Sequence, residues 1–158
     1  MTHDGMWFFH CLQAVGIEKT NELNLAAIGS LAGIEIRRIC RTLGMAEPKI
    51  ETFDALKTFM VDINTLFMPD FMRFHYNFPE DNQMHVAYAP GACFAYKGIQ
   101  RLGVIDGYRC GVFYRLECWF RELGIPFSVT PEVSGCMMHT DGECFRDYVF
   151  NLQLKSTS

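Results

Sequence analysis

Residues 71–89 read FMRFHYNFPEDNQMHVAYA, and their pattern differs from that of the 70 residues before them. Residues 71–78 and 83–89 alternate between apolar and polar side chains, which is typical of half-buried strands. The four residues between them, Pro79 to Asn82, are residue types that favour a turn. This stretch therefore predicts a β-hairpin, and it decides that the fold is not all-helical.

The residues before the hairpin have helical periodicity. Apolar side chains recur every three or four positions over residues 4–44, with one break at Gly16. Thr20 or Asn21 is predicted to cap the helix after this break, and Gly44 to end it. Two glycines within that helix, Gly29 and Gly33, predict the close approach of another helix.

A third helix is predicted from Thr52, its cap, to the residues just before Pro69. Beyond the hairpin, the pattern predicts helices over residues 93–102 and 108–123 and strands over residues 127–133 and 144–152. The expected fold class is α+β, with N-terminal helices followed by a small antiparallel sheet that helices cover.

The composition predicts one domain over residues 1–158, with a helical part (1–70) and an α+β, metal-binding part (71–154). Hydrophobic residues make up 49% of the chain and charged residues 20%, and there are 14 Phe and 9 Met. This apolar surplus exceeds what one small sheet covers. We therefore expect a ligand cavity between helices and sheet, or a homodimer formed through the first two helices.

The charge pattern argues against two classes of partner. The formal net charge is −4, and the compact basic group Arg37, Arg38 and Arg41 is most simply a solvated helix face, so no nucleic acid is expected. No stretch approaches the roughly 20 apolar residues that span a bilayer. The N-terminus lacks the form of a signal peptide, so a cytoplasmic location is expected.

Seven cysteines is an odd number for a disulfide framework, and reduced thiols suggest metal or thiolate chemistry instead. Cys136 and Cys144 are expected at strand ends on either side of a short polar connection, and Cys110 near the start of the preceding helix. Three such thiols suit tetrahedral Zn²⁺, with iron as the alternative metal. Glu132, His139 or water would complete the site. The competing interpretation is that these cysteines are buried small apolar residues.

Other residues are candidates for catalysis or ligand binding. Cys93 is expected at a helix N-terminus, where the dipole lowers a thiol pKa, so it is the best candidate nucleophile. The favoured interpretation, however, is that Cys93 is a small residue that fills a tight strand-to-helix turn. His10 is a weaker catalytic candidate. The aromatic residues that could line a cavity, or simply fill the core, are Tyr88, Phe94, Tyr96, Tyr108, Phe113 and Trp119.

The stretch Tyr108-Arg109-Cys110, with Glu132, Cys136 and Gly142-Glu143-Cys144 after it, resembles the C-terminal part of vinyl-reductase-type (four-vinyl reductase) domains. It is also similar to the sensor domains of phenol- and toluene-responsive transcription activators. The resemblance implies zinc bound by the three cysteines and the glutamate, beneath a pocket for an aromatic ligand. Glu132 lies four residues before Cys136, where the family pattern has three, so the fourth ligand stays open.

The whole chain, beginning His3-Asp4-Gly5-Met6-Trp7-Phe8, also resembles an uncharacterised family of anaerobes placed near the thiazoline-carboxylate hydrolases. Together these observations predict a zinc-containing sensor or carrier domain for a small apolar or aromatic molecule. The alternative is a metal- or thiol-dependent hydrolase of a small molecule, which would keep an open metal position or use Cys93. A third possibility is an interaction module without metal.

Overall fold

The sheet has four antiparallel strands in the order β1-β2-β4-β3 within the described part of the chain, which in this computed structural model is residues 2–67 and 74–154. The strands are β1 (Phe74–Asn77), β2 (Gln83–Tyr88), β3 (Phe127–Thr130) and β4 (Cys144–Phe150). The β1–β2 hairpin, which the alternation predicts, pairs Asn77 with His85. Residues 71–73 of the predicted first strand, and Pro69, lie outside the described residues.

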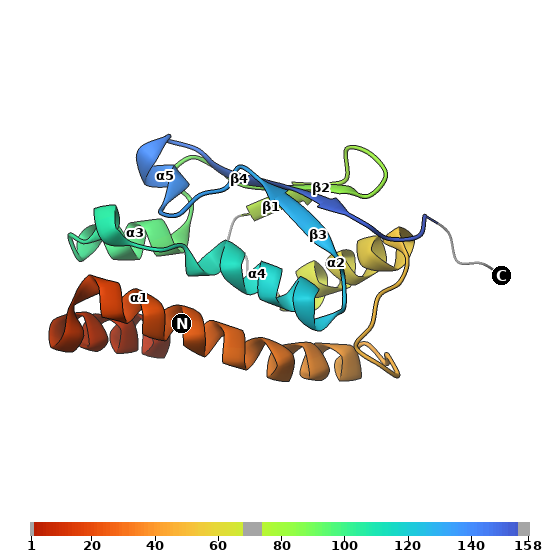
Figure 1. Ribbon diagram of the computed structural model, residues 1–158, viewed down its shortest axis with the longest axis horizontal. Helices are drawn as coiled ribbons and strands as arrows, with labels where there is room; N and C mark the ends of the chain where they lie inside the picture. Colours follow the sequence, from red (N-terminus) through yellow and green to blue (C-terminus); the bar gives the residue numbers. More distant parts are fainter. Residues whose placement is uncertain (1, 68–73, 155–158) are drawn as a thin grey trace.

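The described helices confirm the α+β class, and Figure 1 shows α1, α2 and α4 on one side of the sheet. They are α1 (Thr2–Thr42), α2 (Phe53–Phe67), α3 (Phe94–Arg101), α4 (Gly111–Glu122) and the short α5 (Met137–Thr140), with a 3-10 turn at Ile105–Gly107. Figure 1 shows α4 lying between α1 and the sheet. No helix in the described ranges is both long and apolar enough to cross a membrane.

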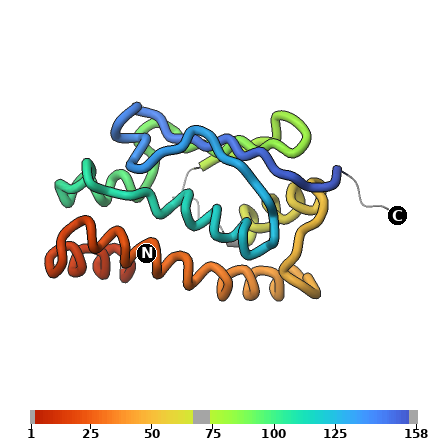
Figure 2. The backbone as a smooth tube through the Cα atoms, viewed as in Figure 1, coloured from red at the N-terminus to blue at the C-terminus, as the bar shows by residue number. Residues whose placement is uncertain are grey.

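The first helix is broken at Gly16, as predicted, because this residue has a non-helical backbone with φ of 76°. The tube in Figure 2 shows the chain reversing direction at this end of the molecule. The predicted cap at Thr20 or Asn21 is wrong, since both residues lie inside the second helical part and are buried. The Thr20 hydroxyl donates to the Gly16 carbonyl, one turn earlier.

One predicted boundary is confirmed, and two features differ from the sequence prediction for identifiable reasons. Thr52 does cap α2, since its hydroxyl accepts a hydrogen bond from the Ala55 N–H. However, α4 begins at Gly111 rather than residue 108, because Tyr108 and Cys110 have extended backbones. The connection before Cys144 is also not the polar strand-to-strand link that was predicted. It contains α5, whose Met137 and Met138 are buried.

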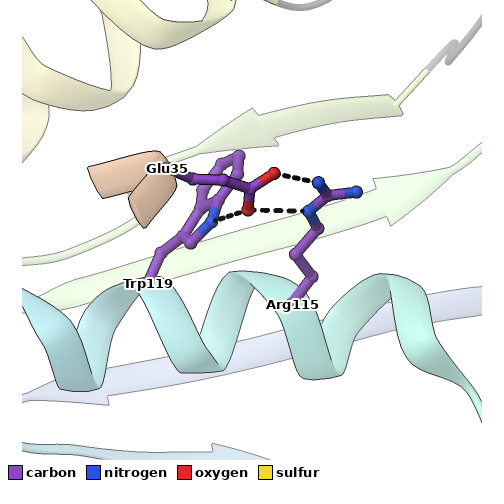
Figure 3. A network of polar contacts seen from close by, with 3 residues as sticks. All are labelled: Glu35, Arg115 and Trp119. Carbon is purple, nitrogen blue, oxygen red and sulfur yellow. Dashed lines mark hydrogen bonds and ion pairs between the residues drawn. The ribbon is translucent and has the colours of Figure 1, made fainter. Parts of the chain in front are cut away.

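The contact between α1 and α4 is made by polar as well as apolar groups. The Glu35 carboxylate accepts hydrogen bonds from Arg115, at 3.0 Å for Nε, and from Trp119 Nε1 at 2.8 Å (Figure 3). Gly29 and Gly33 face α4 as predicted: a Cβ added at Gly33 would lie 2.8 Å from an oxygen of Glu122. The close approach of these helices fixes α4 in front of the sheet.

The inner face of the sheet is set by the two-residue period of β4. Cys144, Arg146, Tyr148 and Phe150 are buried, whereas Phe145, Asp147 and Val149 are more exposed. The Phe120 ring of α4 packs against Tyr148 and Phe150 at centroid distances of 5.4 and 5.2 Å. The aromatic residues therefore build the core, and one arginine is buried in the same row.

Candidate functional site

Four cysteines begin the elements at one end of the sheet. Cys93, Cys110 and Cys136 are the residues immediately before α3, α4 and α5, and Cys144 is the first residue of β4. Cys110 is half-buried and the other three are buried. The sequence places them 17, 26 and 8 residues apart, so only the fold brings these four elements together.

The thiols of these residues lie near enough to affect one another electrostatically; we call Cys93, Cys110, Cys136 and Cys144 the thiol cluster. Burial, followed by the neighbouring thiols of Cys110, Cys93 and Cys136, raises the pKa of Cys144 to about 12. The pKa of Cys136 is also raised, first by burial and more weakly by Cys110. In the absence of a cation, these two thiols are therefore protonated at neutral pH.

Two buried tyrosines adjoin the thiol cluster. Burial raises the pKa of Tyr88 and Tyr108, and the nearby thiols of Cys93 and Cys110 raise both further. The Tyr108 hydroxyl accepts a hydrogen bond from the N–H of Gly111 at 3.2 Å. Both phenols therefore stay neutral over the physiological pH range.

Cys110 is positioned by a residue of α1. The Asn21 amide donates to the Gly107 carbonyl at 2.7 Å and accepts from the Arg109 N–H at 3.1 Å. One buried side chain thus holds the extended segment that leads to Cys110. Buried polar groups need hydrogen-bond partners. Here the Asn21 amide and the backbone groups of Gly107 and Arg109 satisfy one another. Asn21 was predicted to be a helix cap, and the residues next to it in the sequence do not indicate this contact.

The thiol cluster has the donor chemistry of a zinc site, since soft sulfur ligands suit Zn²⁺. No group of three or more His, Cys, Asp or Glu side chains that could hold a metal ion is found within residues 2–67 and 74–154. The residue types of the thiol cluster fit zinc. The sulfur atoms of its four cysteines, as they are placed here, do not converge on one point. A change of staggered rotamer redirects each sulfur without moving the backbone.

The two predicted fourth ligands point to different places. Glu132 is exposed and lines the same pocket as Cys110. His139 lies on α5, where its Nε2 is 2.8 Å from a carboxylate oxygen of Asp106. Glu132 is therefore the better placed of the two.

The pocket beside Cys110 has a volume of about 380 Å³, which is within the roughly 300–1,000 Å³ of ligand sites. It lies between α4, residues 129–134 and β4, with one contribution from α1. Its lining residues are Leu25, Arg109, Cys110, Phe113, Tyr114, Glu117, Val129, Pro131, Glu132, Val133, Ser134 and Arg146. Cys110 thus belongs to both the thiol cluster and the pocket.

Of the six aromatic residues predicted to contact a ligand, only Phe113 lines this pocket. Tyr88 and Tyr108 are buried beside the thiol cluster, and the Trp119 indole is bonded to Glu35. The remaining two, Phe94 and Tyr96, are half-buried residues of α3 that do not line the pocket.

The predicted catalytic residues have ordinary surroundings. Cys93 does precede a helix, but burial, its largest influence, raises its pKa, and the lowered pKa predicted for a nucleophile is not found. The N–H groups of Tyr96 and Ala95 act in the opposite direction and are outweighed. His10 is an exposed residue of α1 and does not line the pocket.

The sequence reasoning missed Arg146, the most unusual residue of the pocket. Its side chain is 4% exposed, yet it carries a permanent charge. The signal was present, because strand alternation from Cys144 puts residue 146 on the same inner face. An arginine in such a row is rare enough to mark a site.

Comparison of this chain with protein-family models, curated proteins and solved structures gives no match.

Proposed function

We propose that this chain is a small-molecule-binding domain, a sensor or carrier, with a structural zinc ion held by Cys110, Cys136 and Cys144. One observation carries the proposal: these thiols, from three separate elements, lie in one electrostatically coupled cluster that shares Cys110 with the pocket. Such an ion would cross-link α4, α5 and β4 at one end of the sheet.

The raised pKa values support a cation in this cluster. The buried thiols of Cys136 and Cys144 have no chemical advantage as free groups, because burial and the neighbouring thiol of Cys110 raise the pKa of both. A bound divalent cation reverses this effect, since it stabilises the thiolates directly. Iron, the alternative metal, would use the same donors.

The fourth ligand is proposed to be Glu132, because it lines the pocket together with Cys110. Cys93 is an alternative that the fold adds, since its thiol interacts with those of Cys110 and Cys136. His139 is less favoured because its ring already contacts Asp106.

The resemblance to vinyl-reductase-type domains agrees with this arrangement. In that family the metal lies beneath the ligand pocket, and here one pocket-lining cysteine belongs to the cluster. The thiol-dependent hydrolase, which was the alternative, gains no support from Cys93, because the pKa of its thiol is raised. Four protein ligands would favour a structural ion, and three with water a catalytic one.

Elemental analysis of protein purified without added metal tests the proposal. We expect about one zinc per chain, and loss of the metal with a drop in stability of several kcal/mol in Cys136→Ser. Cys118→Ser is the matched control, because Cys118 is buried on α4 outside the thiol cluster. Less than about half an equivalent of zinc or iron, with unchanged stability in Cys136→Ser, would contradict the proposal.

Cobalt substitution identifies the fourth ligand. The intensity of the thiolate-to-cobalt charge-transfer band grows with the number of bound thiolates. Loss of one thiolate in Cys93→Ala would assign the fourth position to Cys93. An unchanged band in Cys93→Ala, with weaker metal binding in Glu132→Gln, would assign it to Glu132.

A homodimer through α1 is also proposed. Several large apolar side chains on this helix are 36–49% exposed: Met6, Trp7, Val15, Leu23, Leu31 and Ile34. Burying such side chains is a common basis of association. Light scattering after size exclusion should give twice the chain mass, and Leu31→Glu with Ile34→Glu should halve it. A monomeric wild-type protein would contradict this part.

A further inference from the structure

Arg146 lies in the middle of the inner face of the sheet, between Cys144 and Tyr148 in the buried row of β4. It pairs in register with Val86 of β2, which is also buried. A guanidinium remains charged at every accessible pH, and burying it is costly unless an anion or several acceptors compensate. The contacts of Arg146 therefore decide whether this charge is structural or functional.

The contacts that Arg146 makes leave much of its capacity unused. Nη1 donates to the carbonyl of Phe145 at 2.7 Å and lies 3.7 Å from Met137 Sδ, and the guanidinium carbon lies 4.7 Å from the centroid of the Phe113 ring. No carboxylate lies within 4.0 Å of this side chain in the described residues. Among the described residues, no acceptor is found for the other N–H groups of the guanidinium. The Arg146 side chain also lines the pocket.

A buried tyrosine on the same inner face of β4 lacks a hydrogen-bond partner. Tyr148 is 0% exposed, and its hydroxyl makes no hydrogen bond within the described residues. Burial raises the pKa of this hydroxyl, and Glu117 and Arg146 are the charged side chains that act on it most strongly, in opposite directions. Unpaired buried groups of this kind are infrequent and commonly indicate a missing bound molecule. Tyr148 does not itself line the pocket, but Arg146, two residues earlier on β4, does. The Arg146 guanidinium with this unpartnered hydroxyl behind it therefore indicates a polar end for a ligand.

The other lining residues define the rest of that ligand. Arg109 and Arg146 oppose Glu117 and Glu132, and Glu117 is paired with Arg121 outside the pocket at 3.3 Å. The balance therefore favours one negative charge on the ligand and disfavours a dianion. The remaining wall is largely apolar, with Leu25, Phe113, Val129, Pro131 and Val133.

We propose that this pocket binds a small apolar or aromatic monocarboxylate, whose carboxylate pairs with the buried Arg146 guanidinium. This inference rests on the proposed small-molecule-binding function and names the chemical class of its ligand. A guanidinium fork matches the two oxygens of a carboxylate, and the pair is strong when water is excluded. The ligand's apolar body lies against Phe113 and Val133.

Calorimetric titration of the purified full-length protein with benzoate, phenylacetate and their neutral amides tests the class. We expect each carboxylate to bind roughly ten- to a hundred-fold more tightly than its amide, as a charge-assisted hydrogen bond implies. Arg146→Met keeps the apolar stem and should abolish this preference. Arg101→Met, an exposed arginine at the end of α3, is the matched control and should retain it.

A second measurement covers the case in which Arg146→Met does not fold. In wild-type protein the Nε–Hε resonance of Arg146, identified by its proximity to the Phe113 ring, should shift on adding benzoate and not benzamide. Equal binding of acid and amide, no benzoate binding, or tighter binding of inorganic phosphate than of benzoate would overturn the monocarboxylate. A preference retained in folded Arg146→Met would overturn the role of that residue.

The outcomes also separate this inference from the zinc proposal. A carboxylate preference in protein that contains no metal would contradict the zinc ion and leave the ligand class standing. A full equivalent of zinc without any carboxylate preference would support the zinc ion and contradict the proposed ligand class.

Discussion

Trp119 Nε1 lies 2.8 Å from Glu35 Oε2, so an indole that was predicted to contact a ligand instead joins two helices. Arg115, one turn earlier on α4, donates to the same carboxylate. The three side chains form the polar part of the α1–α4 contact (Figure 3). Glu35 is therefore expected to matter for stability rather than for binding.

Glu35→Gln should lower the free energy of unfolding by about 1–3 kcal/mol, because it removes the charge that two donors share. Urea denaturation measures this change. Glu18→Gln, an exposed residue on the same helix, should change stability by less than about 0.5 kcal/mol. Equal effects of the two substitutions would mean that the Glu35 contacts contribute nothing specific.

Asn21→Leu should destabilise the protein by about 2–4 kcal/mol and weaken the proposed zinc binding, because it frees the backbone that leads to Cys110. Asn21→Asp keeps the acceptor for the Arg109 N–H and loses the donor to the Gly107 carbonyl. It should therefore be less damaging. The idea fails if Asn21→Leu unfolds at a lower urea concentration but binds zinc with unchanged affinity.

Gly111→Ala should destabilise the protein by about 1–3 kcal/mol through overpacking. A Cβ there would lie 2.8 Å from Ile28 Cδ1 and 3.0 Å from Asn24 Nδ2, both on α1. Gly98→Ala on α3 meets open space and should stabilise by about 0.5–1 kcal/mol through helix propensity. Thermal unfolding of both variants measures the contrast. A stabilised Gly111→Ala protein would show that α1 and α4 are less closely packed.

Glu117 gives a pH-dependent contribution to stability. Burial, the largest influence, raises the pKa of its carboxyl above the value of the unfolded chain, against the opposing effects of Arg121 and Arg146. The unfolded chain therefore loses this proton at a lower pH than the folded one. The contribution is fully present below the unfolded pKa, near 4.5, and is lost as pH rises through the folded value.

Glu117→Gln resembles the protonated form and should therefore stabilise the protein modestly at pH 7, with the gain disappearing near pH 4. Urea midpoints at both pH values, in the absence of ligand, test this. Glu143→Gln, an exposed residue, should show no such difference. A Glu117→Gln protein that is less stable than wild type at pH 7 would show that the Arg121 contact outweighs burial.

The features predicted correctly from the sequence are those that neighbouring residues determine. The alternation in residues 83–88 was sufficient to predict β2, and the Thr52 hydroxyl to predict the start of α2. The start of α4 could not be predicted in this way, because its preceding segment is held by Asn21, which is 86 and 88 residues away. Contacts at that sequence separation leave no periodicity.

The candidate site, too, was predictable from the sequence only in part. Cysteine spacing predicted that Cys110, Cys136 and Cys144 would lie together, and the fold places Cys93 with them. Arg146 could have been found, because the alternation of β4 puts it on the inner face. Its missing carboxylate partner could not, since that depends on every side chain around the pocket.

The Asn21 amide gives α1 a second purpose besides covering α4. A shortened polypeptide beginning at residue 45 would contain Cys93, Cys110, Cys136 and Cys144, yet it would lack the only described side chain that bonds to the backbone at both Gly107 and Arg109. Its cysteines would have the same spacing in the sequence, but the backbone segment that leads to Cys110 would not be held in place. The candidate site therefore cannot be transferred as a C-terminal segment alone. A graft of residues 93–144 onto another scaffold would also need a neighbouring helix with an amide side chain in the place of Asn21.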